Sequence, residues 1–504
     1  MFPRVLKRHT VSLHRGNPTY PDPPPYSPAV PYPEYPFASP TISATSNWAY
    51  SGVREALRLL QLDAGEFGTA NWNPLGPIVR PGHTVVLKPN FVRHFRETHS
   101  GDGDCIITHG SVIRAVLDYV YRALEGRGRI VIADAPQNDA DFAEIRRIVG
   151  LDEIQEFYRQ HATLEVEVYD LRSEMAHKTD GVIVGHTPLV GDPSGYVQVN
   201  LGQHSAFAEV KHLCDRLYGA EYDTRELRRH HHDDVHEYLI ARTVLDADVV
   251  IGIPKLKTHK KTGLTVNLKN LVGINGNKNW LPHHREGTPN QGGDQFEGNG
   301  LKRAAEQVAV EQFKKLFPYL GPLRRLMARP AKALGKWTFG DTNTNTVRSG
   351  NWYGNDTTWR MVHDLNRILL YADAQGQLHQ EPVREFFSVV DGIVAGEGNG
   401  PLDPTPKQTG LIVAGGNPLA VDLACARLMG FDYERIPMLK CALDEHSLPL
   451  ASFGHEDVVG RSDDPRFDVR LADMNGSLFR FEPHFGWKGH VEIGAGVNET
   501  SAFA

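Results

Sequence analysis

The chain has 504 residues, of which 23% are charged and 40% hydrophobic, and its formal net charge is −7 at pH 7. This is the composition of an ordinary globular protein, long enough for one large core with elaborations or for two domains. The negative net charge argues against general nucleic-acid binding, because that function needs a basic surface.

The cysteines are few and widely separated. They are Cys105, Cys214, Cys425 and Cys441, and none forms a CxxC pair. This spacing argues against an iron–sulfur cluster or a thiolate zinc site, so no Fe–S cluster is expected. A disulfide framework is also unexpected in so long a chain, which favours a cytoplasmic location. We find no secretory signal and no run of about 20 apolar residues that would predict a transmembrane helix.

Residues 1–46 are predicted to form an extended arm. Residues 17–40 read NPTYPDPPPYSPAVPYPEYPFASP. Proline fixes φ and removes a backbone donor, which disfavours a helix or a central strand. The tyrosines give the arm apolar area to bury, so docking on the body is favoured over a free tail.

Residues 47–300 alternate helices and strands. Apolar residues at helical spacing predict helices over 47–62 and 111–124. Short apolar runs predict strands over 83–92, 129–136, 166–171 and 247–253. The last of these strands leads into a polar loop.

The second half of the chain interrupts this pattern and then returns to it. Residues 301–342 form a basic helical insertion with three internal prolines. Its residues 301–340 fit a lid, a solvated hairpin or a helix resting on an anionic membrane surface. Residues 343–450 continue the α/β domain, with a strand over 386–401 that runs into an acidic, glycine-rich loop. Residues 451–504 are a C-terminal extension of strand and loop.

Alternating helices and apolar strands predict an α/β fold, with a mostly parallel sheet and helices on both faces. In such sheets the ligand site lies outside the carboxyl ends of the strands. The polar segments KPN, ADAP and PKLKTH all follow predicted strands. We therefore expect these three turns to meet at one site.

Residues 254–273, PKLKTHKKTGLTVNLKNLVG, are predicted to form a loop that binds a small, multiply charged anion. Ammonium groups supply charge, and hydroxyl and amide side chains supply directional hydrogen bonds. A basic crossover loop that only positions a helix is the alternative. The predicted substrate-binding residues are Lys88, Asn90, Lys255, Lys257, Thr265, Asn267 and Asn270.

Three residues are predicted to transfer protons or to orient the groups that do so. His109 precedes the helix over 111–124, whose N-terminus attracts anions. His259 lies within the cationic segment, and Asp391 begins the acidic glycine-rich loop. Each has a structural alternative, such as a histidine that caps a helix or an aspartate that closes a turn.

A divalent metal is the predicted cofactor class, with Asp134, Glu397 and His283 as ligands. Asp134 ends a predicted strand, and Glu397 lies in the glycine-rich loop. His283 follows the cationic segment, where a flap over the site is expected. Carboxylate oxygens and imidazole nitrogens are suited to divalent ions, but the same carboxylates could simply close tight turns.

These segments together resemble the family known as domain of unknown function 362 (DUF362). The resemblance is carried by VVLKPNFV, THGSVIRAVLDYV, IADAP, ADVVIGIPKLKTHKKTGLTVNLKNLVG, VVDGIVAGEGNGP and GLIVAGGNPLAVDLACARLMG. Many relatives carry a ferredoxin-like module with iron–sulfur clusters. This chain lacks those cysteines, so the resemblance does not extend to electron transfer.

A short stretch is also similar to the nickel-pincer lactate racemase family. His259, Gly263, Lys269 and Gly273 have a similar order and spacing. The resemblance implies that Lys269 is a catalytic residue that holds a nickel–pyridinium cofactor, and that His109 is a catalytic histidine. The crowded lysines of this chain depart from the racemase pattern.

The leading hypothesis is a cytoplasmic enzyme that acts on a small carboxylate or phosphate, by isomerase or transferase-like chemistry. One alternative is a non-catalytic binding protein or a scaffold at a membrane surface. The other is a racemase or isomerase with a lysine-linked nickel-pincer cofactor. A nucleic-acid partner is not expected.

Overall fold

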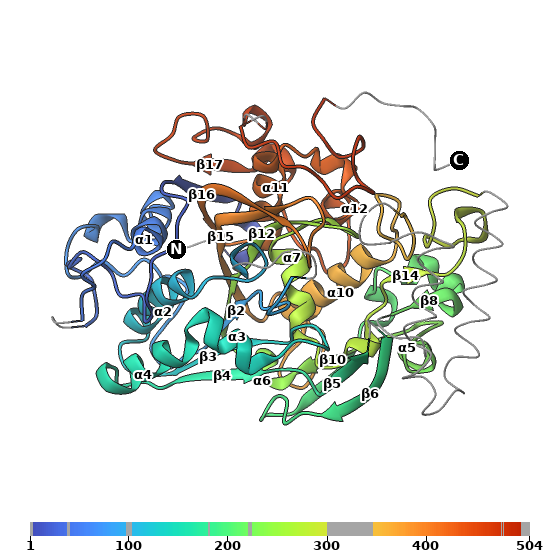
Figure 1. Cartoon of the computed structure of the whole chain (residues 1–504), viewed down its shortest axis with the longest axis horizontal. Coiled ribbons are helices and arrows are strands. Elements are labelled where there is room, and N and C mark those ends of the chain that lie inside the picture. The colour runs from blue at the N-terminus through green and yellow to red at the C-terminus, as the bar shows by residue number, and fades with distance from the viewer. Residues whose placement is uncertain are drawn as a thin grey trace.

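The computed structural model describes residues 4–37, 41–96, 103–179, 182–219, 224–299, 346–474, 476 and 478–494. The main sheet has the strand order β17–β1–β16–β15–β11–β2–β3–β4 (Figure 1). The strands from β15 to β4 are parallel, whereas β16 is antiparallel to β15 and β1. The predicted α/β fold with a mostly parallel sheet is thus confirmed. The bounds are β1 (Thr10–Arg15), β2 (Thr84–Pro89), β3 (Arg129–Asp134), β4 (Val166–Asp170), β11 (Val249–Ile253), β15 (Glu385–Glu397), β16 (Thr405–Gly415) and β17 (Val459–Arg461).

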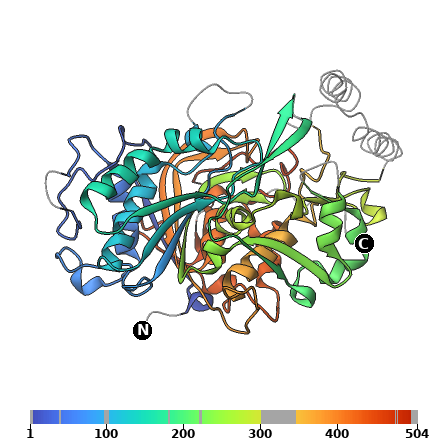
Figure 2. The same cartoon turned by 90° about the horizontal axis from the view of Figure 1, so that it is seen from below.

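Helices cover both faces of this sheet (Figure 2). One layer contains α1 (Trp48–Leu59), α2 (Gly110–Leu124), α3 (Phe142–Val149) and α4 (Leu151–His161), and the other contains α10 (Thr358–Tyr371) and α11 (Pro418–Met429). In β11, Val249 and Ile251 belong to one hydrophobic core and Val250 to the other. Successive side chains of a strand point to opposite faces, so a strand covered on both sides is apolar throughout.

Smaller elements surround the main sheet. Three small sheets are β7–β10–β9, β14–β8 and β5–β6. Their strands are β5 (Glu174–Thr179), β6 (Val182–Pro188), β7 (Tyr196–Asn200), β8 (Leu217–Tyr218), β9 (His231–His232), β10 (Val235–Ala241) and β14 (His284–Arg285). The short helices are α5 (Arg225–His230), α6 (Arg242–Leu245), α7 (Asn267–Asn270) and α12 (Pro437–Lys440).

The cationic segment is not the loop that its charges suggested. It forms β12 (Lys255–His259), a turn, β13 (Gly263–Thr265) and then α7. β12 pairs with β13 and also with β15, where Lys255 is opposite Asp391 and Lys257 opposite Gly396. Lysine is depleted in strands and rarely fully buried, which is why the sequence reads as a loop.

The acidic glycine-rich loop is likewise mostly strand, because residues 391–397 lie inside β15. Glycine in a strand often marks a close approach of two backbones. At Gly396, an added Cβ would lie 2.8 Å from the carbonyl oxygen of Cys105 and 3.0 Å from Cβ of Lys257. The glycine therefore allows β12 and β15 to pack closely and does not make this segment flexible.

The N-terminal arm packs on the body. Residues 10–15 form β1 and join the main sheet beside β16, so this part of the arm belongs to the sheet. Further along, Tyr26 and Phe37 are buried in the core that contains α2 and α4. The aromatic residues of the arm thus supply apolar area that is buried against helices.

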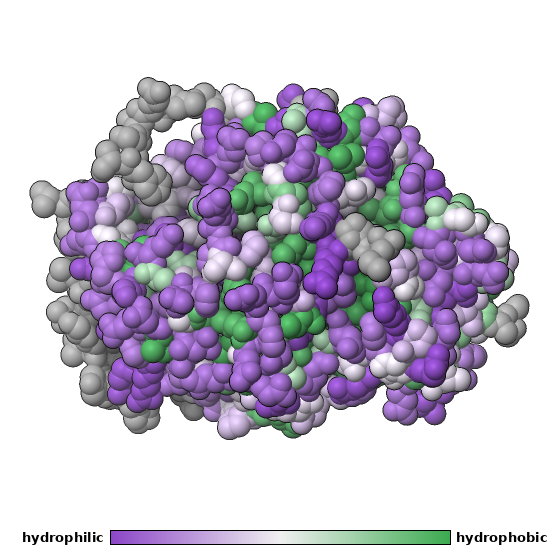
Figure 3. All heavy atoms as spheres, turned by 180° about the vertical axis from the view of Figure 1, so that it is seen from behind, coloured by the Kyte–Doolittle hydropathy of each residue, from purple (hydrophilic) through white to green (hydrophobic). Residues whose placement is uncertain are grey.

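The surface is mainly hydrophilic, with hydrophobic residues dispersed among hydrophilic ones on the face seen in Figure 3. Within the described ranges, every helix is too short or too polar to cross a membrane. The predicted basic insertion, residues 301–342, lies outside the described residues.

Candidate functional site

A cavity of about 400 Å³ lies beyond the carboxyl ends of β2 and β3, between them and the β12–β13 hairpin. We call it the cationic cavity, because five lysines line it. They are Lys257, Lys260, Lys261, Lys269 and Lys278. Asp134 is the sole carboxylate among the described lining residues. Of the predicted site residues, this cavity brings together Asn90, Asp134, Lys257, His259, Thr265, Lys269, Asn270 and His283.

The charge of Asp134 is already neutralised by Lys88. The Lys88 ammonium lies 2.7 Å from Asp134 Oδ1, and both side chains are buried. Asp134 also accepts the backbone N–H of Phe91, at 2.7 Å. A Cβ on Gly273 would lie only 1.9 Å from Asp134 Oδ1, so this position needs glycine. Among the described residues that line the cavity, the one carboxylate is therefore already paired with Lys88.

A chain of amide hydrogen bonds fixes one wall of the cavity. The Lys257 ammonium, which is fully buried, donates to Asn90 Oδ1 at 2.9 Å. Asn90 Nδ2 donates to Asn270 Oδ1 at 3.0 Å, and Asn270 Nδ2 donates to the carbonyl of Lys88 at 2.9 Å. The turn after β2 is thereby joined to α7. This agrees with the expectation that the polar turns at the carboxyl ends of the strands meet at one site.

Burial and mutual repulsion shift the lysines toward their neutral forms. Burial lowers the pKa of Lys261 and of Lys278 to about 7, with Lys269 adding repulsion in both cases. Burial, followed by the charge of Lys88, lowers the pKa of Lys269 to about 8. These are the shifts expected where burial and like charges outweigh the attraction of Asp294 for Lys261 and of Asp134 for Lys278.

Two of the three histidines that line the cavity, His259 and His283, are neutral and carry their protons on different nitrogens. His259 Nδ1 accepts the backbone N–H of Lys261, at 3.1 Å, so its proton is on Nε2. His283 Nδ1 donates to the carbonyl of Leu281, at 2.8 Å, which leaves Nε2 as an acceptor. Burial, with repulsion from nearby lysines, lowers the pKa of His259 strongly and that of His283 to about 3. His259 therefore presents a hydrogen-bond donor, and His283 presents an acceptor.

Thr265 completes the cavity with a hydroxyl that has no partner. Its Oγ1 is buried and makes no hydrogen bond to any described residue. Buried polar atoms are nearly always hydrogen-bonded, so an orphan of this kind in the wall of a cavity suits contact with a ligand.

His109, Lys255 and Asp391 lie outside the cavity, in a second buried cluster. Asp391 accepts from the Lys255 ammonium at 2.8 Å and from the His109 backbone N–H at 2.9 Å. It also accepts from the hydroxyl of Tyr20 at 2.6 Å, and the Tyr20 ring stacks on His109 with centroids 4.0 Å apart. His109 caps α2 by accepting the N–H of Ser111. These groups thus contact one another through hydrogen bonds and ring stacking. Tyr20 of the N-terminal arm belongs to this cluster, although the sequence did not indicate it.

The predicted metal ligands do not meet. Glu397 pairs with Lys407 at 2.7 Å and accepts the N–H of Glu482, away from the cavity that holds Asp134 and His283. Over the described part of the chain, no three His, Cys, Asp or Glu side chains are grouped so as to hold a metal ion. Glu397 was assigned on the assumption of a flexible loop, whereas β15 fixes its direction.

Asn267 is also engaged elsewhere. Its backbone N–H and Nδ2 donate to Asp422 of α11, at 2.8 and 3.1 Å, and its Oδ1 accepts from Ser388. Asp422 accepts the N–H of Leu268 as well, at 3.0 Å. Asn267 and Asp422 thus anchor the start of α7, which carries Lys269 and Asn270.

Lys278 is a cavity residue that the sequence did not single out. Its ammonium donates to the carbonyls of Ala135 and Val272, at 2.8 and 3.4 Å. It lies only a few positions beyond the cationic segment, in the sequence NGNKNW. A lysine among asparagines and glycine gives no signal of burial, so the sequence could not have identified it.

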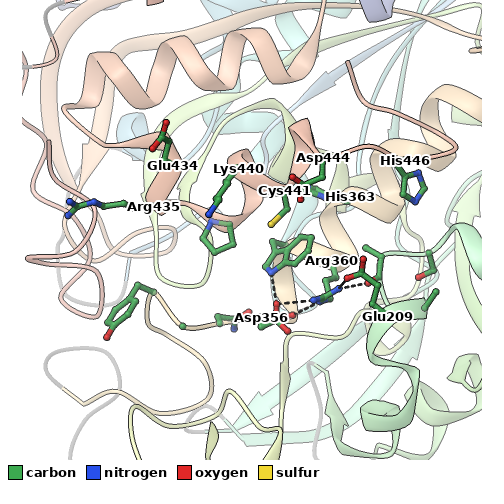
Figure 4. Close-up of a pocket in the computed structure, with 18 of the residues that line it drawn as sticks. Glu209, Asp356, Arg360, His363, Glu434, Arg435, Lys440, Cys441, Asp444 and His446 are labelled. Carbon is green, nitrogen blue, oxygen red and sulfur yellow. Dashed lines mark hydrogen bonds and ion pairs between the residues drawn. The ribbon is translucent and has the colours of Figure 1, made fainter. Parts of the chain in front are cut away.

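A larger cavity, of about 950 Å³, lies between α10, α12 and the segment around Glu209 (Figure 4). Charges of both signs line it, and several are paired. Arg360 lies 3.1 Å from Glu209 and 3.2 Å from Asp356, which also accepts from Trp359 Nε1 at 3.0 Å. Paired charges make this cavity a weaker candidate for an anion than the cationic cavity.

Comparison with known proteins shows that this chain is distantly similar to a known protein sequence and to a solved structure. The thylakoid-associated protein sll1697 of Synechocystis sp. is 21% identical over 365 residues, which are 72% of this chain and 68% of that protein. A crystal structure of a Thermotoga maritima protein matches with a TM-score of 0.29 and 12% identity. That match covers 78% of this chain and 60% of the solved chain.

A family model described as "Domain of unknown function (DUF362)" matches residues 156–427. The matched range contains the β12–β13 hairpin, α7 and most of α11, whereas Lys88, Asn90 and Asp134 precede it. The match covers more than half of the chain and confirms the resemblance drawn from the motifs. The chain belongs to the DUF362 family.

Proposed function

We propose that this protein is an enzyme that binds a small phosphate- or carboxylate-bearing molecule in the cationic cavity. The observation that carries the proposal is the gathering of five lysines around a space whose one described carboxylate is already paired with Lys88. Like charges this close raise the free energy of the fold, and a bound anion would relieve the repulsion.

The neighbouring histidines support a reaction that moves protons. His259 presents an N–H and His283 an unprotonated nitrogen, and both line the cavity. A positioned acid and base on one small molecule suit isomerase or transferase-like chemistry. Membership of the DUF362 family does not itself supply a reaction.

A second candidate is the racemase or isomerase with a lysine-linked cofactor. His259, Lys269 and Gly273 line the same cavity, which favours this idea, whereas His109 lies in the Tyr20 cluster and does not. A membrane-surface scaffold has no comparable support, and the cytoplasmic location stays a prediction.

Sulfate and pyrophosphate are expected to raise the melting temperature of the protein. At about 100 times the Kd, a ligand that binds only the folded state adds about 2.7 kcal/mol to the free energy of unfolding. Lys257→Met and Lys269→Met should each lose most of this shift. Lys211→Met is the matched control, because it removes an exposed lysine that pairs with Asp234. Equal shifts in all three variants, or none in the wild type, would refute the proposal.

The stabilisation by sulfate is expected to weaken as the pH rises from about 6 to about 9. In the anion-free fold, Lys261, Lys278 and Lys269 lose their protons near pH 7, 7 and 8, whereas sulfate stays a dianion. Without sulfate, the free energy of unfolding should rise over the same range, because unfolded lysines, with a pKa of about 10.4, bind more protons than folded ones. Urea denaturation with and without sulfate measures both trends, and a pH-independent effect of sulfate would count against the cavity as its site.

A further inference from the structure

Lys269 differs from Lys257, Lys261 and Lys278 of the cationic cavity in the hydrogen bonding of its side-chain amine. Lys257, Lys261 and Lys278 each donate hydrogen bonds to backbone or amide oxygens. Lys269 has no hydrogen-bond or ion-pair partner among the described residues. Its amine is therefore the one of these four that no neighbour holds.

Lys269 also shares the cavity with several other titratable groups. Its charge helps to lower the pKa of Lys257, His259, Lys261, Lys278 and His283. These five groups and Lys269 all line the same cavity. A ligand held by the surrounding lysines would therefore lie against the Lys269 amine.

The environment makes this amine nucleophilic. Burial and the Lys88 charge lower the pKa of Lys269 to about 8, so a substantial fraction is unprotonated near neutral pH. Lysines desolvated beside another cation are the ones that form Schiff bases.

We propose that Lys269 forms an imine with the carbonyl group of an anionic ligand bound in the cationic cavity. The ligand class is a phosphate- or carboxylate-bearing aldehyde or ketone. The inference rests on the proposed anion-binding function, which it deepens by naming the reactive group of the ligand.

The step needs no oxidant or metal. The nitrogen lone pair of Lys269 adds to the carbonyl carbon, and the carbonyl oxygen takes up a proton to give a carbinolamine. The C–O bond then breaks, and the oxygen leaves as water with the two protons of the original amine, so that C=N replaces C=O. His283 Nε2, which is unprotonated, and His259 Nε2–H are placed in the same cavity to accept and return those protons.

The probe is pyridoxal 5′-phosphate, which carries an aldehyde and a phosphate. The full chain is incubated with it and reduced with borohydride, and labelled peptides are quantified by mass spectrometry. Labelling of Lys269 should exceed that of any other lysine by at least about tenfold near neutral pH. Exposed lysines are almost fully protonated at this pH, and Lys261 and Lys278 are held by backbone carbonyls. Excess pyrophosphate should suppress the label, and the labelling rate should reach half its maximum near pH 8.

Two variants separate reactivity from binding. Lys269→Arg keeps the cation but has no primary amine, so it should lose the label and retain stabilisation by pyrophosphate. Lys211→Arg alters an exposed lysine that pairs with Asp234, away from the cavity, and should keep the label. Stabilisation by pyrophosphate with no preferential label on Lys269 would overturn the imine and leave the proposed function standing. Loss of both the stabilisation and the label would overturn both.

Discussion

Asp134→Asn is expected to lower the free energy of unfolding by about 3–5 kcal/mol, because it leaves the buried Lys88 ammonium without its counter-charge. Lys88 is fully buried and its ammonium lies 2.7 Å from Asp134. Asparagine keeps an oxygen that can accept the N–H of Phe91, so the loss reports mainly on charge. Chemical denaturation measures it.

The double variant Lys88→Met/Asp134→Asn is the control for this prediction. Removing both charges avoids an unpaired buried ion, so the double variant should be markedly more stable than Asp134→Asn alone. Sulfate should also stabilise Asp134→Asn more than the wild type, since a bound anion can replace the lost carboxylate. If Asp134→Asn were within about 1 kcal/mol of the wild type, Lys88 would not depend on Asp134.

Asp391→Asn is expected to cost a similar amount, about 3–5 kcal/mol, and to release the N-terminal arm. Asp391 is the counter-charge of the fully buried Lys255 and the acceptor for Tyr20 of the arm. Limited proteolysis should then cut within residues 16–37 faster than in the wild type. Denaturation and proteolysis of one preparation measure the two effects together.

Tyr20→Phe is the matched control for Asp391→Asn. It removes the hydroxyl that bonds Lys255 and Asp391 but keeps the ring that stacks on His109 and leaves the ion pair in place. The hydroxyl makes three hydrogen bonds, to Lys255, Asp391 and the backbone N–H of Val394. A loss of about 2–3 kcal/mol is expected, smaller than that of Asp391→Asn because the ion pair remains. An Asp391→Asn protein with wild-type stability and an uncut arm would show that this cluster does not hold the arm.

The elements with regular apolar periodicity could be predicted from the sequence. α2 and β3 fall within a residue or two of the predicted ranges, because a helix that covers a sheet and a strand buried on both faces have distinct patterns. The meeting of Asn90, Asp134 and Lys257 followed from one rule, that parallel strands present their carboxyl ends on the same side.

The hairpin and the second cluster could not be predicted in this way. β12 contains two lysines and a histidine, so its propensity opposes a strand, and only pairing with β15 reveals one. Tyr20 and Asp391 are 371 positions apart, and no local pattern relates them. The sequence placed Lys255 after a strand and His109 before a helix. It could not show which of these polar groups would contact Tyr20 and which would face a cavity.

The most direct test of the cationic cavity as an anion site is a crystal structure of the full chain soaked in selenate, with the anion located by selenium anomalous scattering. Our account predicts a peak inside the cavity, within hydrogen-bond distance of Lys257 or Lys269 and close to Thr265. A cavity that holds only water, with selenate confined to the outer surface, would contradict it.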